Sequence, residues 1–179
     1  MATRTLLTID DFERLPDNVV KNKELVDGEL VDVSGNTPRH NLLRDRLLNI
    51  MLSWVQEKHL GTVISEQEYD FDDNAHGPDV SFFGLSKKAL LNLNKRVQPF
   101  VPDLAIEIPS RHDTYESIIR KKDRYLSAGT QEVWLISMEQ REIEVYTQDA
   151  IRFYRGSTTI ATDLLPGLTI SLENLFREL

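Results

Sequence analysis

The stretch that decides the fold is Val101-Pro-Asp-Leu-Ala-Ile-Glu-Ile-Pro-Ser110. Residues 104–108 form a nearly continuous apolar run, which is typical of a strand that is buried on both faces. Glu107 interrupts this run, and burying an isolated charge is costly unless the charge has a partner. The segment therefore predicts a central strand that carries one paired ionisable side chain.

A second short apolar strand, Pro78-Asp-Val-Ser-Phe-Phe83, is also opened by Pro-Asp. Neighbouring strands lie about 4.8 Å apart, and Mg²⁺ typically binds one or two carboxylates, so Asp79 and Glu107 can share an ion if their strands pair. Asp103 lies four residues before Glu107, about 13 Å along the same strand, so we assign it to the start of that strand. The alternative is that these carboxylates form ordinary structural ion pairs.

The next element is a helix from about Thr114 to Ala128, closed by Gly129. Lys122 falls at the centre of its apolar arc and Lys121 at the edge of that arc. One interpretation is that either lysine only extends its stem over apolar surface. The other is that one lysine reaches back to the carboxylates, where it could stabilise charge on a phosphate. Periodicity leaves the choice between the two lysines open.

The remaining elements follow from periodicity and turn signals. We expect helices at about 8–16, 39–59, 86–94 and 171–179, hairpins at 23–33 and 142–154, and strands at 62–69 and 132–137. Thr8 and Asp11 have the form of a capping box, and Asp27-Gly28 favours a type I′ turn. Strands bracketed by helices in this order predict an α/β fold with a mixed sheet, in one domain over residues 1–179.

Composition indicates a globular chain and opposes one class of function. The chain has 179 residues, 40% of them hydrophobic, which is enough to bury one substantial core. Its net charge is -8, whereas nucleic-acid binders gain much of their affinity from basic patches on phosphates. This acidic balance argues against tight nonspecific binding of DNA without a metal ion, a second subunit or another partner.

The absence of characteristic motifs argues against several other classes of protein. There is no cysteine, no Gly-x-Ser-x-Gly elbow and no Walker A loop, and the four histidines lack zinc-ligand spacing. The sequence contains no apolar run of about 18 residues and no apolar stretch of secretory type at its start, so we expect neither a membrane span nor export. A cytoplasmic location fits the absence of cysteine.

Nine segments of the chain match one known family in order and spacing. They are Glu24–Val31, Pro38–His40, Pro78–Phe82, Pro102–Glu107, Ser110, Lys121, Tyr125, Ala128-Gly129 and Glu132–Ile136. The chain resembles the restriction-endonuclease-like family catalogued as domain of unknown function 820, within the PD-(D/E)xK nuclease superfamily. The resemblance runs from about Thr8 to Ile170. It implies a restriction-endonuclease-like core, which is a mixed β-sheet flanked by helices.

The resemblance also implies a metal site. Asp79 and Glu107 would bind Mg²⁺ or Mn²⁺, with the carbonyl of Ile108 as a third ligand. The broad superfamily has its lysine two residues after the glutamate, where this chain has Pro109. The family carries the lysine on the following helix, and the spacing fits Lys121.

Lys122 stands at a position that is usually apolar in the family, which favours Lys121 as the catalytic lysine. Glu24 matches a hairpin glutamate that would support the metal or the water; the alternative is a cross-strand ion pair on the surface. His40 matches another family position, although a lone histidine that opens a helix is more often a capping or packing residue.

We therefore expect a metal-dependent endonuclease that hydrolyses phosphodiester bonds in nucleic acid, with DNA as the expected substrate. Asp79, Glu107, Lys121 and Glu24 are its candidate catalytic residues. The alternative is a non-catalytic regulatory or interaction module that retains the nuclease fold. The acidic charge favours that module, and the complete set of Asp79, Glu107 and Lys121 opposes it. A homodimer is compatible with either function.

Overall fold

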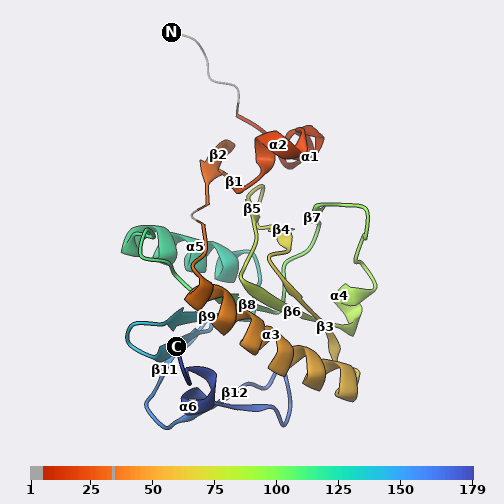
Figure 1. Ribbon diagram of the computed structural model, residues 1–179. Helices are drawn as coiled ribbons and strands as arrows, with labels where there is room; N and C mark the ends of the chain where they lie inside the picture. Colours follow the sequence, from red (N-terminus) through yellow and green to blue (C-terminus); the bar gives the residue numbers. More distant parts are fainter. Residues whose placement is uncertain (1–5, 34) are drawn as a thin grey trace.

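The computed structural model describes residues 6–33 and 35–179 (Figure 1). The helices are α1 (Ile9–Arg14), α2 (Asp17–Val20), α3 (Pro38–Lys58), α4 (Leu85–Lys88), α5 (Tyr115–Ser127) and α6 (Leu172–Leu175). The strands are β1 (Lys23–Val26), β2 (Glu29–Asp32), β3 (Gly61–Ser65), β4 (Glu68–Asp70), β5 (Ala75–His76), β6 (Val80–Gly84), β7 (Val97–Gln98), β8 (Leu104–Glu107), β9 (Glu132–Ser137), β10 (Glu142–Tyr146), β11 (Ile151–Arg155), β12 (Thr159–Ala161) and β13 (Thr169–Ser171).

A six-stranded sheet with the order β11-β10-β9-β8-β6-β3 forms the centre of the protein. The pair β8–β9 is parallel and the other pairs are antiparallel, so the sheet is mixed. Strand β8 lies inside this sheet, and its residues Leu104, Ala105 and Ile106 are fully buried. The predicted α/β class and the predicted central strand are both confirmed.

The two faces of the central sheet are covered by different layers. One face packs against α3 and α6, and Figure 1 shows α3 crossing the front of the sheet. The other face packs against α5 and against a second sheet, which has the order β2-β1-β5-β4-β7. The site described below lies between this second sheet, α5 and the end of β8.

Helix α3 follows from clear local signals. The Thr37 side chain caps it by accepting the N–H of His40, and Pro38 takes the first turn, where its missing donor costs nothing. His59 ends the helix in the left-handed conformation, with φ of 54°. The buried face of the helix consists of His40, Leu43, Leu47, Met51 and Val55.

The hairpin of β1 and β2 has the predicted turn. Asp27 and Gly28 both have positive φ, at 51° and 77°, as a type I′ turn requires. Strand β1 also pairs with β5, through Leu25 and Ala75, and thereby joins the second sheet. The hairpin thus stands beside α5 and brings Glu24 toward that helix.

Two predicted elements differ from the structure. The expected strand at 62–69 is divided at Glu66, whose φ is 53°, so that β3 and β4 belong to different sheets. The expected helix at 86–94 stops at Lys88. The Gln98 side chain accepts a hydrogen bond from the backbone N–H of Asn92 at 2.9 Å and donates one to the Asn92 carbonyl at 3.0 Å. These two bonds take the place of the backbone bonds that Asn92 would form in a longer helix.

The C-terminal part of the chain differs from the prediction in two further respects. The C-terminal helix is α6 alone and is shorter than the expected 171–179. Strands β12 and β13 form a small antiparallel sheet that the sequence did not predict. Within the described parts of the chain, no helix is both long and apolar enough to cross a membrane.

Candidate active site

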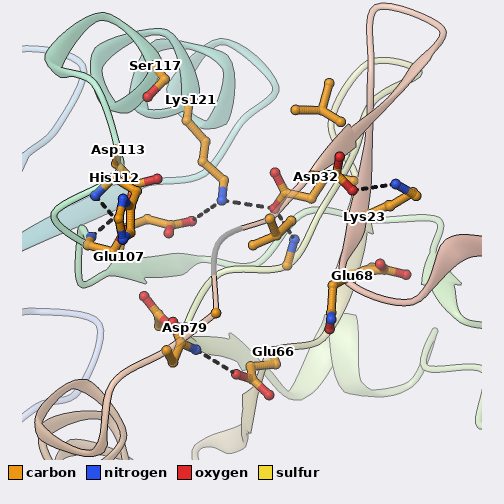
Figure 2. Close-up of a pocket in the computed structure, with 18 of the residues that line it drawn as sticks. Lys23, Asp32, Glu66, Glu68, Asp79, Glu107, His112, Asp113, Ser117 and Lys121 are labelled. Atoms are coloured by element: carbon orange, nitrogen blue, oxygen red, sulfur yellow. Dashed lines mark hydrogen bonds and ion pairs between the residues drawn. The ribbon is translucent and has the colours of Figure 1, made fainter.

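The two predicted metal-binding carboxylates lie at adjoining ends of two paired strands: Asp79 directly precedes β6 and Glu107 ends β8. Strands β6 and β8 are antiparallel, with Val80 opposite Ile106. Continuing this register by one pair places Asp79 opposite Glu107. Directly opposed residues point to the same side of a sheet, with Cβ atoms about 4.5–5.5 Å apart. Both side chains line one cleft (Figure 2), so the pairing on which their shared role depends is present.

Asp79 is held by contacts on both of its oxygens. Its Oδ2 accepts the backbone N–H of Ile108 at 2.7 Å, which ties Asp79 to the end of β8. Its Oδ1 lies 3.2 Å from Nε2 of His40, a buried residue of α3. Burial lowers the pKa of His40, but the hydrogen bond and the charge of Asp79 outweigh burial and raise it. His40 therefore lies at the predicted metal site.

Glu107 has two partners on a single oxygen. Its Oε1 accepts the O–H of Tyr125 at 2.6 Å and lies 3.2 Å from Nζ of Lys121. Burial raises the pKa of Glu107, Lys121 opposes this effect, and the charges of Asp79 and Glu24 add to it, so that the pKa reaches about 7. Glu107 is thus a buried carboxylate that would gain from a nearby cation.

Lys121 reaches from α5 between two carboxylates. Its Nζ lies 2.9 Å from Oε1 of Glu24 and 3.2 Å from Oε1 of Glu107, as Figure 2 shows for Glu107. Burial lowers the pKa of Lys121, but the charges of Glu107 and Glu24 outweigh burial and raise it. Lys122 points elsewhere: it pairs with Asp123 and lies 4.8 Å from the ring centroid of Tyr146. Of the two lysines, the structure brings Lys121 to the predicted site.

Glu24 connects the hairpin to this cluster. Besides Lys121, its Oε1 accepts the backbone N–H of Gly77 at 3.2 Å, and its Oε2 lies 2.9 Å from Nδ1 of His76. Burial would raise the pKa of Glu24, but the charge of Lys121 and the hydrogen bond from His76 outweigh it and lower the pKa to about 2. Glu24 is therefore ionised beside Lys121 at neutral pH, rather than a member of an exposed cross-strand pair.

Two residues outside the predicted site, His76 and Arg124, extend this network. Nε2 of His76 lies 3.0 Å from Nη1 of Arg124, and Nη2 of Arg124 lies 2.7 Å from Oδ1 of Asp27. His76 belongs to β5 and Arg124 to α5, which are far apart in the sequence. Only the packing of α5 on the second sheet brings them together, so no local signal could have found them.

Asp103, the competing carboxylate, lies outside this cluster. It forms an ion pair with Lys87 at 2.7 Å, accepts the backbone N–H of Gly84 at 2.8 Å and accepts from Gln131 at 2.9 Å. These contacts tie the start of β8 to neighbouring elements. They agree with the interpretation that Asp103 marks the beginning of that strand.

The cleft around the cluster has a volume of about 900 Å³ and is lined by more carboxylates than cationic side chains. The carboxylates are Asp17, Glu24, Asp32, Glu66, Glu68, Asp79, Glu107 and Asp113, and the cations are Lys21, Lys23, Arg96 and Lys121. Such a surface repels phosphate unless cations screen it. The negative charge of the cleft therefore favours binding of a cation over binding of a polyanion in the absence of that cation.

The donor set fits a hard divalent cation. Within residues 6–33 and 35–179, no three carboxylate or imidazole side chains gather closely enough to surround one ion. Mg²⁺ does not require such a cage, because it keeps several waters and commonly binds one or two carboxylates together with substrate phosphates. Asp79 and Glu107 supply that number, the Ile108 backbone lies beside them, and both described contacts of Glu107 fall on Oε1.

Comparisons with known proteins agree with this architecture. Residues 9–173 match the family model Uma2, described as "Putative restriction endonuclease". A crystal structure from Anabaena variabilis ATCC 29413, described as "a putative nuclease belonging to DUF820", superposes with a TM-score of 0.84 at 22% identity. The alignment covers 95% of this chain and 97% of the other, and at this identity it shows a shared fold. No curated protein matches the sequence.

Proposed function

Since the chain belongs to the Uma2 family of restriction-endonuclease-like proteins, we propose that it is a metal-dependent endonuclease that hydrolyses phosphodiester bonds in DNA. The observation that carries the proposal is the convergence of three side chains in one cleft: Asp79, directly before β6, Glu107, at the end of the paired strand β8, and Lys121 from α5. Two carboxylates that can hold a metal ion and a lysine that can offset phosphate charge are a combination suited to hydrolysis of a phosphodiester.

Each residue has a distinct part in the proposed reaction. Asp79 and Glu107 would hold Mg²⁺ or Mn²⁺, which when bound supplies Lewis acidity and lowers the pKa of water. The ammonium group of Lys121 offsets negative charge that develops on the phosphate and orients the attacking water. Glu24 holds Lys121 at this position through the 2.9 Å contact, and His40 orients Asp79 through the 3.2 Å contact.

The test of the proposal is divalent-metal binding followed by cleavage. Calorimetry with Mg²⁺ and with Mn²⁺ compares the wild type with Asp79→Ala and Glu107→Ala, and Asp45→Ala serves as a matched control on the exposed surface of α3. We expect saturable binding in the wild type and in the control, and none in the two site variants. The same proteins are then incubated with supercoiled plasmid and Mg²⁺, where only the wild type and the control should produce nicked or linear DNA.

The alternative, a non-catalytic module, is favoured by the net charge of -8 and by the acidic cleft. The two functions differ in their dependence on metal. A module should neither bind Mg²⁺ through Asp79 and Glu107 nor cleave DNA, single-stranded DNA or RNA at any metal concentration. Metal binding that both substitutions abolish, together with cleavage, would exclude the module.

A further inference from the structure

The hydrogen-bond chemistry of arginine fixes the protonation of one buried histidine beside the site. A guanidinium group donates hydrogen bonds and accepts none. Nη1 of Arg124 lies 3.0 Å from Nε2 of His76, so Nε2 must be the acceptor and must carry no proton. The imidazole proton therefore lies on Nδ1, which donates to Oε2 of Glu24 at 2.9 Å. His76 is neutral and has a single tautomer.

The surroundings of His76 hold the ring in this orientation. The ring lies edge-on to Tyr125, with centroids 5.8 Å apart, and tilted against Phe71 at 6.0 Å. His76 is almost completely buried, so water does not compete for either nitrogen. Burial also lowers the pKa of His76, and Lys121 and Arg124 act in the same direction against Glu24.

The second hydrogen-bond arm of Arg124 determines where the guanidinium lies. Its Nη2 forms an ion pair with Oδ1 of Asp27 at 2.7 Å, at the tip of the β1–β2 hairpin. Asp27 is itself fixed, because its backbone N–H donates to Oδ1 of Asn74 at 2.7 Å. One arginine therefore couples the hairpin to the histidine on β5.

We infer that His76 and Arg124 form a positioning pair for Lys121. Arg124 fixes the Nδ1–H tautomer of His76, and this proton holds the carboxylate of Glu24 so that its other oxygen faces Lys121. A charged His76 would instead compete with Lys121 for the single negative charge of Glu24. The importance of this pair for catalysis depends on the proposed function of Lys121. The tautomer of His76 and the geometry of the pair do not depend on that function.

The tautomer is tested first, on the wild-type protein. Long-range ¹H–¹⁵N correlation spectra of the histidine rings distinguish a protonated Nδ1 from a protonated Nε2, and the spectrum of His76→Asn identifies the signals of His76. We expect a neutral ring with its proton on Nδ1 near neutral pH. A proton on Nε2, or on both nitrogens, would overturn the inference whatever the activity of the protein.

The positioning role is tested on the amine of Lys121, without reference to cleavage. Folded variants, verified by circular dichroism, are labelled with an acylating reagent, and modification of Lys121 is followed by mass spectrometry. Arg124→Leu and His76→Gln should label Lys121 about fivefold faster than the wild type, as expected for the loss of one hydrogen bond. His76→Asn should label at the wild-type rate, because its amide N–H takes the place of Nδ1–H.

Arg120→Leu is the matched control, since Arg120 is an exposed residue of the same helix and lies one turn before Arg124. Equal labelling of Lys121 in all variants would overturn the positioning role. If the tautomer and the labelling pattern hold but the wild type cleaves no nucleic acid, the pair stands and the proposed nuclease function fails.

Discussion

The ammonium group of Lys121 lies 3.2 Å from Oε1 of Glu107, although Glu107 ends β8 and Lys121 belongs to the following helix. Pro109 stands where a lysine two residues after the glutamate would be. The strand has no lysine at that position, and helix α5 instead places Lys121 beside the carboxylate of Glu107. This contact supports the assignment of Lys121, rather than its neighbour Lys122, as the cation of the proposed reaction.

Replacing this lysine should abolish most of the cleavage. Lys121→Met removes the cation that would offset charge on the phosphate, and we expect the single-turnover rate of plasmid cleavage to fall by roughly 10²–10³-fold. Lys122→Met is the matched control, because Lys122 pairs with Asp123 outside the cluster. A normal rate in Lys121→Met together with a large loss in Lys122→Met would reverse the assignment.

The pH dependence of stability should carry the signature of Glu107. Its pKa is raised from 4.5 to about 7, so between these values the folded state binds more protons than the unfolded state. Its contribution is fully present below pH 4.5 and is lost as the pH rises toward 7, whereas the contribution of Glu24, with a pKa of about 2, changes only below that window.

Metal-free wild type and Glu107→Gln should therefore differ in the slope of stability against pH. Between about pH 5 and pH 7.5, urea denaturation should show the wild type losing on the order of 1–3 kcal/mol relative to the variant. The histidines contribute to both proteins and largely cancel in the difference. Parallel pH profiles would show that Glu107 titrates normally.

The parts of the fold that could be predicted from the sequence are those with local causes. The Asp27-Gly28 turn, the capping box of Thr8 and Asp11, and the buried strand 104–107 each depend on residues within a few positions of one another. The division of the strand at Glu66, whose backbone N–H donates to the carbonyl of Pro78 at 3.1 Å, and the early end of α4 depend on residues further along the chain. The Gln98 side chain, six positions from Asn92, accepts the backbone N–H of Asn92 in place of a helical carbonyl. The pattern of apolar residues in the sequence does not indicate this bond.

The site divides in the same way. Asp79 and Glu107 were recognisable because the first opens a short apolar strand and the second interrupts another, but their shared role required the pairing of β6 with β8. Periodicity left the two lysines undecided, the family resemblance favoured Lys121, and the direction in which α5 packs brings Lys121 to Glu107. His76 and Arg124 meet across two elements, so their contact has no counterpart in the order of the sequence.

His40 should tune metal affinity through Asp79. Its Nε2 lies 3.2 Å from Oδ1 of Asp79, and loss of a partner that orients a metal ligand typically costs about 10–100-fold in affinity. We expect His40→Ala to bind Mg²⁺ more weakly within this range by calorimetry, and His40→Gln, which keeps an N–H donor, to recover most of the affinity. His59→Asn, at the left-handed end of α3, is the control. Tighter binding in His40→Ala would mean that repulsion by a charged imidazole dominates.

Tyr125 should set the pH at which the site accepts a metal ion. Its O–H donates to Oε1 of Glu107 at 2.6 Å, and this bond lowers the pKa of Glu107 against the effect of burial. Tyr125→Phe removes the bond but keeps the ring, which stacks on Phe71 with centroids 4.1 Å apart. Metal binding requires the ionised carboxylate, so the pH midpoint of Mg²⁺ binding should rise by about one unit, the equivalent of one hydrogen bond to a charged group. Tyr146→Phe, which loses a bond to Glu144 outside the cleft, should leave the midpoint in place. If the pH midpoint of Mg²⁺ binding is unchanged or lower in Tyr125→Phe, the hydrogen bond from Tyr125 does not lower the pKa of Glu107.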